Sequence, residues 1–381
     1  MKTNFGKGLL AFSEGDYKQA FSFFEKAHRE NIPSDKHLTL YNTGLSLIFL
    51  GDLALAEDYF LKALRNFPDH ADTLHWIAYI NFRKGQLSIA EDHYLSSLKS
   101  HLRSQTSING CIHFFIEQGL NGEEIKSFLN KNGVQLKANE NFYFKLADSV
   151  NVSIDSNIIF SLIGIDPRST MQTSIKNYGC YEPLMVEKIL KHVGKTDIVY
   201  DIGAHIGYYS CIFNSVTESK KVVSLEPDFY SSNLIKRNTN ERGIVVNKFI
   251  GSELDHNTTT LNDLSSMLSL EPSVIKMDIE GFEVEAFEGG WELIRNLRPQ
   301  IFLEIHPKFI HKRNPKAFEK LVAELFKIYN MEYARNHWGP IKGKETFESE
   351  WKKATPDIIF NIANDIIFND QRPNAFAMHC F

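Results

Sequence analysis

Small and aromatic residues recur with a fixed period along the first third of the chain. A glycine, an alanine and an aromatic residue return in the same order, and the glycines lie 36 and 34 residues apart. The recurring positions are Gly15, Gly51 and Gly85, then Ala20, Ala56 and Ala90, then Phe24, Phe60 and Tyr94. Small residues at fixed offsets let two antiparallel helices pack closely, and the aromatic ring fills the gap to the next pair. The pattern predicts three helix pairs over 1–100 and a degraded fourth pair over 103–133.

This period resembles that of the tetratricopeptide repeat, which is about 34 residues long. We therefore expect an all-α helical repeat domain over residues 1–135. Such an array acts either as a scaffold or dimerisation surface, or as a groove that captures a peptide or a carrier protein. The packing residues do not separate these two uses, but both make a protein the expected partner of the repeats.

Beyond residue 139, apolar runs of strand length alternate with helical segments. We predict strands at 197–200, 222–226, 244–250, 274–277 and 300–305, with helices between them that include 283–296. This alternation favours a parallel sheet with helices on both faces, and hence an α/β Rossmann-like domain over 139–381. Two late strands are expected near 357–361 and 375–380. In such a sheet, ligands bind at the carboxyl ends of the strands.

The stretch VYDIGAHIGYYS at 199–210 joins a strand to a helix through a glycine turn. Asp201 stands before the turn, Gly203 and Gly207 bracket it, and Glu226 ends the next strand 25 residues after Asp201. Backbone N–H groups in such a turn can meet a nucleotide-like ligand, and the second acid can bind ribose hydroxyls. The turn lacks the GxGxxG spacing of dinucleotide sites, which argues against a nicotinamide-dependent oxidoreductase. The two acids suit S-adenosylmethionine, which carries an amino acid and a ribose.

Composition and charge limit the binding partners and the cellular compartment that we expect for the protein. The net charge of −5 gives no reason to expect nucleic acid or an anionic membrane as a partner. No apolar run approaches the roughly 18 residues of a spanning helix, and the first residues do not resemble a secretory signal. The four cysteines are scattered and show no CxxC spacing, which favours free thiols in a reducing compartment. We therefore expect a cytoplasmic protein.

Six motifs in fixed order then give the second domain a specific resemblance. They are YGCYEP at 178–183, VYDIGAHIGYYS at 199–210, VVSLEP at 222–227, TTLNDL at 259–264, IKMDIEGFEVEAFEGG at 275–290 and LRPQIFLEIHP at 297–307. This set resembles the FkbM-type S-adenosylmethionine-dependent methyltransferases, which are Rossmann-like O-methyltransferases that often act on sugars or polyketide-derived metabolites. The chain departs from the usual pattern at His205, where asparagine is common, and at Asn262, where aspartate is usual.

The resemblance implies a set of cofactor contacts. Asp201, Gly203, Ala204 and Gly207 would surround the methionine part, and Glu226 would bind the ribose. His205 would either reach the cofactor or point into solvent.

Two acidic clusters at adjacent strand ends are candidates for the chemistry. Asp278 and Glu280 follow one strand, while Glu304 and His306 close another. An alcohol is a poor nucleophile until its proton is removed or polarised. Asp278, Glu304 and His306 could bind a divalent cation such as magnesium that acidifies the hydroxyl, or His306 could be the general base itself. Equally, Glu280 could cap a helix and Glu304 could be a structural acid.

These observations predict an O-methyltransferase that uses S-adenosylmethionine. The expected acceptor is a hydroxyl of a sugar in a glycan or glycoconjugate, and the repeats would bind the acceptor or a partner protein. Two alternatives stay open. The repeats could form a scaffold beside an inactive methyltransferase domain, or the methylated group could be a protein side chain.

Overall fold

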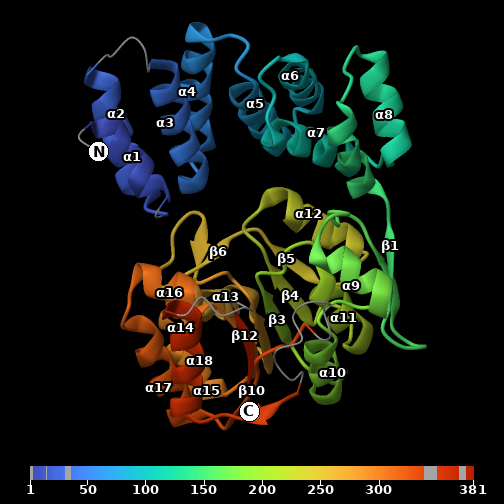
Figure 1. Cartoon of the computed structure of the whole chain (residues 1–381), viewed down its shortest axis with the longest axis vertical. Coiled ribbons are helices and arrows are strands. Elements are labelled where there is room, and N and C mark those ends of the chain that lie inside the picture. The colour runs from blue at the N-terminus through green and yellow to red at the C-terminus, as the bar shows by residue number, and fades with distance from the viewer. Residues whose placement is uncertain (1–2, 14, 31–35, 339–349, 369–374) are drawn as a thin grey trace. The chain divides into compact units, whose positions relative to one another are not determined.

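A computed structural model describes residues 3–13, 15–30, 36–338, 350–368 and 375–381. The chain forms two compact units, Met1–Asp148 and Ser149–Phe381 (Figure 1). The first unit is helical throughout its described residues, and the second contains the sheet. Residues 139–148 belong to the helical unit, whereas the sequence placed them at the start of the second domain.

Eight α-helices follow one another through the first unit, and each packs against the next as far as α7. They are α1 (Asn4–Ser13), α2 (Tyr17–Glu30), α3 (Lys36–Leu50), α4 (Leu53–Asn66), α5 (Ala71–Arg83), α6 (Leu87–Lys99), α7 (Gln105–Glu117) and α8 (Gly122–Lys131). The predicted three pairs and the fourth, degraded pair are therefore present. A 3-10 helix, η2 (Ala138–Ala147), packs on α7 and α8, which explains why the boundary falls after it.

Close packing inside each pair follows the predicted logic of small and aromatic residues. A Cβ atom on Gly8 or Gly44 would lie only 2.5 Å or 2.8 Å from the ring of Phe24 or Phe60. Both rings, and that of Tyr94 in the third pair, are fully buried. The glycine therefore makes room for the aromatic ring of the following helix, and a larger residue would push the two helices apart.

The second unit is built on an eight-stranded sheet with the order β11-β10-β12-β9-β8-β3-β4-β5. Its strands are β3 (Val199–Ile202), β4 (Val222–Leu225), β5 (Ile244–Val246), β8 (Val274–Met277), β9 (Gln300–Ile305), β10 (Met331–Ala334), β11 (Lys352–Lys353) and β12 (Phe376–Cys380). The five strands from β9 to β5 in this order are parallel, while β12, β10 and β11 pair antiparallel. Two small sheets, β1 (Val150–Ser153) with β2 (Ile159–Leu162) and β6 (Phe249–Ile250) with β7 (Thr258–Thr259), lie apart from it.

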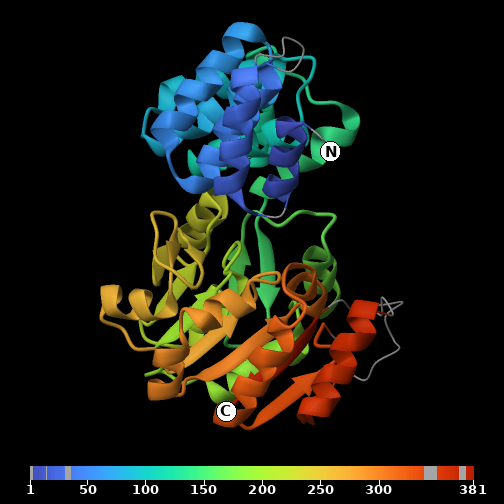
Figure 2. The same ribbon diagram turned by 90° about the vertical axis from the view of Figure 1, so that its left-hand side faces the viewer.

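Helices cover both faces of this sheet (Figures 1 and 2). They are α9 (Thr170–Tyr178), α10 (Pro183–His192), α11 (Tyr208–Val216), α12 (Phe229–Asn238), α13 (Leu261–Leu268), α14 (Glu283–Glu288), α15 (Trp291–Leu297), α16 (Pro307–Arg313), α17 (Ala317–Ile328) and α18 (Pro356–Phe368). Every residue of β3, β4 and β8 is buried, as expected for strands covered on both sides. The predicted Rossmann-like class is confirmed by this arrangement together with the family matches reported below.

Three predicted elements differ from the structure. The late strand expected at 357–361 is wrong, because these residues begin helix α18, where Ile359, Ala363 and Ile366 are buried at helical spacing. The predicted helix 283–296 is two helices, α14 and α15, broken at Gly289–Gly290. The predicted strand 244–250 is also divided, between β5 of the main sheet and β6 of a small one.

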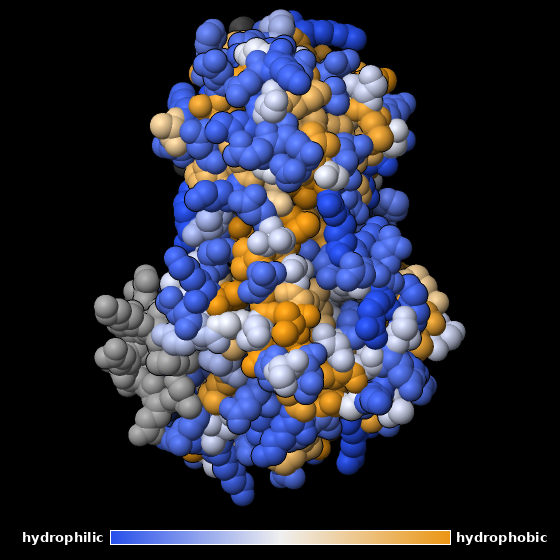
Figure 3. Space-filling model, turned by 90° about the vertical axis from the view of Figure 1, so that its right-hand side faces the viewer, coloured by the Kyte–Doolittle hydropathy of each residue, from blue (hydrophilic) through white to orange (hydrophobic). Residues whose placement is uncertain are grey.

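The surface is mainly polar on the face drawn in Figure 3, where apolar side chains gather in separate patches. None of the helices within the described ranges is long and apolar enough to cross a membrane.

Candidate active site

The glycine turn after β3 is held in its shape from two sides. Gly203 has a φ of +77°, and a Cβ atom there would lie 1.9 Å from the carbonyl oxygen of Asp278 at the end of β8. The N–H groups of Gly203 and Ala204 donate to the carbonyl of Leu225 on β4, at 3.0 Å and 3.1 Å. The turn is therefore wedged between β4 and β8, and only glycine fits at position 203.

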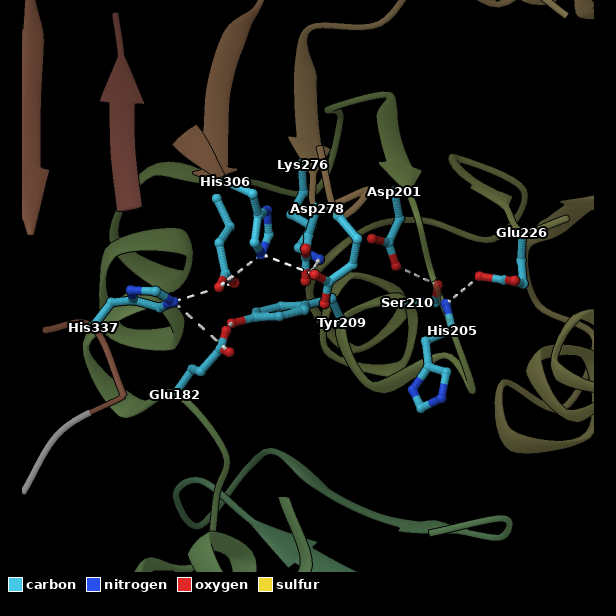
Figure 4. Close-up of polar contacts among 12 residues, drawn as sticks. Glu182, Asp201, His205, Tyr209, Ser210, Glu226, Lys276, Asp278, His306 and His337 are labelled. Atoms are coloured by element: carbon cyan, nitrogen blue, oxygen red, sulfur yellow. Dashed lines mark hydrogen bonds and ion pairs between the residues drawn. The ribbon is translucent and has the colours of Figure 1, made fainter. Parts of the chain in front are cut away.

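Asp201 lies fully buried beneath this turn. Its Oδ2 accepts a hydrogen bond of 2.6 Å from the hydroxyl of Ser210 on α11 (Figure 4). Oδ1 is buried and has no hydrogen-bond partner among the described residues. Burial raises the pKa of this carboxyl above its usual range. Asp201 is absent from the lining of the neighbouring cavity, as is Gly207, so both shape the turn from behind.

Glu226 lies at the carboxyl end of β4 and faces the turn. It accepts hydrogen bonds from the backbone N–H groups of His205, at 2.9 Å, and Asp228, at 2.8 Å. Burial raises the pKa of Glu226 to about 7. His205 has a φ of +50°, and its exposed imidazole extends away from Glu226 (Figure 4).

A cavity of about 510 Å³ opens at these strand ends. Its size lies within the usual range of small-molecule sites. Its lining includes Gly203, Ala204, His205 and Glu226 from the turn and the end of β4, together with Asp278, Glu280, Phe282 and Tyr181. The structure therefore brings four of the six predicted cofactor residues and one of the three predicted catalytic residues to a single cavity. Glu304 and His306 do not line it.

Asp278 is the predicted catalytic residue that lines the cavity. Its Oδ2 lies 3.7 Å from Nζ of Lys276, and its Oδ1 has no hydrogen-bond partner among the described residues. Lys276 is buried, and its ammonium lies 4.6 Å above the ring of Tyr209. Burial alone would lower the pKa of Lys276, but the carboxylates of Asp278 and Asp201 outweigh it and raise that pKa. A fixed positive charge thus stands next to Asp278.

His306 lies behind Asp278 among three carboxylates. Its Nδ1 is 3.0 Å from Glu283, and its Nε2 is 3.3 Å from Glu280 and 3.7 Å from Glu304. Burial opposes the charged form, but the hydrogen bond with Glu283 and the surrounding negative charge outweigh it and raise the pKa of His306 to about 9. This contradicts the predicted pKa of a base that works at neutral pH, because the imidazole holds its proton there.

Four polar side chains in this region are absent from the predicted site residues: Glu182, Lys276, Glu283 and His337. A lysine within the otherwise apolar strand VIKM and a glutamate within the motif YGCYEP were usable signals. His337 follows strand β10 and begins the stretch HWGP at 337–340, an aromatic sequence that suggests a substrate contact but has no spacing typical of a ligand.

The predicted trio Asp278, Glu304 and His306 does not form one group of possible metal ligands. Among the residues that the structure describes, Asp278 groups with Glu280 and His306, while Glu304 groups with Glu182 and His337. Glu304 and Asp278 therefore belong to two different groups of side chains. His306, a member of the Asp278 group, lies 3.7 Å from Glu304.

A parallel sheet with a glycine turn after its first strand, an acid ending the second and a cavity above both defines the Rossmann-like class of methyltransferases. Residues 233–333 match the family model of the FkbM methyltransferase domain, and residues 39–70 match that of the tetratricopeptide repeat. Both resemblances are thereby confirmed. The protein is a methyltransferase that uses S-adenosylmethionine and carries an N-terminal repeat array.

The similar solved structures share little sequence identity with this chain. An FkbM methyltransferase from Methylobacillus flagellatus is 12% identical, with 79% of this chain and 70% of that chain covered and a TM-score of 0.34. Precorrin-6y C5,15-methyltransferase from Geobacter metallireducens is 14% identical over 52% of this chain and 86% of that chain, with a TM-score of 0.32. The pilF protein of Pseudomonas aeruginosa is 16% identical over 34% of this chain, with a TM-score of 0.29, and the chain spans 56% of its length. No curated protein matches the chain.

Proposed function

We propose that the protein transfers a methyl group from S-adenosylmethionine to a hydroxyl group. We further propose that this hydroxyl belongs to a sugar in a glycan or glycoconjugate. The single observation that carries this proposal is the position of Asp278. Its carboxylate lines the cavity, keeps one oxygen free of hydrogen bonds and has Lys276 beside it.

The residues on the cofactor side fit S-adenosylmethionine. Gly203 leaves the turn without a side chain next to the ligand, and Glu226 offers a carboxylate where a ribose would lie. Ala204 and His205 line the same side, while Asp201 and Gly207 hold the turn from behind. When bound, the cofactor supplies an electrophilic methyl group on a positively charged sulfur.

The residues on the acceptor side would activate the nucleophile. We assign Asp278, which lines the cavity, as the group whose carboxylate takes the proton of the acceptor hydroxyl. Lys276 places a positive charge 3.7 Å from this carboxylate. A positioned general base of this kind contributes about 10²- to 10⁴-fold to the rate.

His306 and Glu304 support this site from behind. Protonated His306 supplies positive charge between Glu280, Glu283 and Glu304. A magnesium ion at Asp278, Glu304 and His306 would place a second positive charge where the imidazolium already provides one. We therefore assign His306 to positioning and electrostatics instead of proton abstraction or magnesium binding.

The proposal of a sugar acceptor is supported by the FkbM domain and by the carboxylates at the acceptor end of the cavity. Tetratricopeptide repeats bind proteins, so we infer that the helical unit holds a partner enzyme or the protein part of a glycoconjugate. Methylation of a protein side chain is the second candidate, and it is favoured by the same repeats.

Acceptor screening with radiolabelled S-adenosylmethionine tests the proposal. We expect label on sugars with a free hydroxyl, and no label when that hydroxyl is already methylated. Label on a protein whose glycans have been removed would favour the side-chain alternative. Binding of the cofactor without transfer to any acceptor would support the scaffold alternative.

A further inference from the structure

A second group of polar side chains lies behind the acceptor end of the cavity. Glu182 precedes helix α10, Glu304 lies on β9 and His337 follows β10, so three distant parts of the chain meet here. The exposed fractions of these residues are 2%, 6% and 0%. Glu182 also has a φ of +50°, a conformation that costs energy for a glutamate and that proteins keep mainly where function requires it.

The side chains point their polar atoms toward one centre. Nε2 of His337 lies 3.2 Å from Oε2 of Glu304 and 3.8 Å from Oε1 of Glu182 (Figure 4). Neither ring nitrogen of His337 makes a hydrogen bond with proper geometry to any residue that the structure describes. A fully buried imidazole without such a bond is a polar group that still lacks a partner.

The other oxygen of each carboxylate is held from outside this centre. The hydroxyl of Tyr209 donates a hydrogen bond of 2.5 Å to Oε2 of Glu182. Oε1 of Glu304 lies 3.7 Å from Nε2 of His306. One oxygen of each glutamate is thus oriented by a neighbour, and the other is left to face His337. Metal sites are built in this way, because outer partners fix the ligands.

His306 approaches one carboxylate of this group, with its Nε2 3.7 Å from Oε1 of Glu304. Among the described residues, no lysine or arginine forms an ion pair with Glu182 or Glu304, since Lys276 pairs with Asp278. Two buried carboxylates that face one imidazole nitrogen form a group that a bound cation, or added protons, would stabilise.

We propose that Glu182, Glu304 and His337 bind one divalent transition-metal ion, of which Zn²⁺ and Mn²⁺ are the expected candidates. Two carboxylate oxygens and one imidazole nitrogen are a donor set that suits these ions. Ligand atoms about 2.0–2.2 Å from one ion are separated from each other by about 3–3.5 Å. The 3.2 Å between His337 and Glu304 fits this spacing, and Glu182 needs only a small inward shift. The ion would tie α10, β9 and the segment after β10 together.

Metal binding by the full-length chain tests this proposal without any need for turnover. The protein is freed of purification tags, treated with a chelator and titrated calorimetrically with ZnCl₂ and, separately, with MnCl₂. We expect one strong site of micromolar or tighter affinity, and a Mn²⁺ resonance signal that changes on binding. Absence of a stoichiometric site for both ions would overturn the proposal.

Three variants locate the ion. His337→Asn and Glu182→Gln are expected to weaken binding at least about 100-fold. The matched control is His75→Asn in helix α5, because His75 is also buried and its Nδ1 also lacks a hydrogen bond. It should bind as the wild type does. If His337→Asn does not fold, Glu182→Gln decides, and unchanged affinity in a folded ligand variant would contradict the proposal.

The variant Asp278→Asn distinguishes the proposed metal site from the proposed methyl transfer. It should lose methyl transfer and keep the metal site, since Asp278 is not one of the three ligands. A chain that transfers methyl groups but binds no ion would refute the metal site alone.

Discussion

The two units bury polar groups in opposite ways. In the helical unit the described ion pairs lie at the surface or close to it, as Lys62 with Asp58 does, and the interior holds mostly small, aliphatic and aromatic side chains. In the α/β unit, Asp201, Lys276 and Glu283 are buried, and each lies at or near the carboxyl end of a strand. Burying charge is expensive unless it is paired. The helical unit thus buries few charged groups, whereas the α/β unit buries several at the strand ends where its cavity lies.

The largest effect is expected from Asp278, the cavity-lining carboxylate to which we assign proton abstraction. Asp278→Asn should lower kcat by about 10²- to 10⁴-fold, because the amide cannot accept the acceptor's proton. Affinity for S-adenosylmethionine should change little, and calorimetry alongside steady-state kinetics checks both. Asp357→Asn, on an exposed turn of α18, is the control. An active Asp278→Asn enzyme would remove Asp278 from the chemistry.

A change in the core of the helical unit should act on stability alone. Phe60→Ala removes a fully buried ring that packs on Gly44, and we expect a loss of about 3–5 kcal/mol in the free energy of unfolding of that unit. Cofactor affinity should be unchanged. Hydrogen exchange measured by mass spectrometry resolves the two units. Loss of protection confined to the α/β unit would contradict this division of roles.

Two glycines have nearly the same φ but different surroundings. Substituting each of them distinguishes the cost of a strained backbone from the cost of a steric clash. Gly15 has a φ of +80° with open space around it, whereas Gly203 has a φ of +77° and no room for a Cβ atom. Gly15→Ala should cost about 1 kcal/mol of stability. Gly203→Ala should cost about 2–3 kcal/mol and should also weaken cofactor binding, because the turn must move away from Asp278. Equal effects of the two substitutions would show that crowding at position 203 is unimportant.

The smallest effect is a difference in pH dependence. The pKa of His306 rises from 6.5 to about 9 on folding, so its stabilising contribution is complete below pH 6.5 and is lost as the pH rises toward 9. In the helical unit, burial lowers the pKa of His75 to about 4, so its destabilising effect is absent above pH 6.5, grows as the pH falls toward 4 and is complete below that. From pH 6.5 to 9 the α/β unit should therefore lose stability while the helical unit does not. His306→Asn should flatten the slope, and denaturant melts at several pH values measure it.

The difference between the units also determines what the sequence could reveal. The spacing of Phe24 and Phe60 is a local pattern, and neighbouring helices pack through it, so the helical unit was predictable almost completely. Asp201, Glu226 and Asp278 were predictable because each directly follows or ends a strand, and parallel strands bring their carboxyl ends to one edge.

The contacts made across elements were not predictable in this way. His337 and Glu182 are 155 positions apart in the sequence, and only the antiparallel pairing of β10 and β12 next to β9 brings His337 to Glu304. The pKa of His306 depends on Glu283, which lies on α14, whereas His306 follows β9. Such pairs have no period and no spacing rule. The misread segment at 357–361 had a usable signal, since Pro356 stands at the first position of a helix and Ile359, Ala363 and Ile366 repeat with helical spacing.

Calorimetric titration of the full-length protein with S-adenosylmethionine, and separately with NADH, tests the central claim most directly. The same titrations on Asp201→Asn keep the shape of the buried residue and remove its charge. We predict micromolar binding of S-adenosylmethionine, binding at least about 10-fold weaker in the variant, and no binding of NADH. Absence of S-adenosylmethionine binding in the wild type, or tighter binding of NADH, would contradict the account.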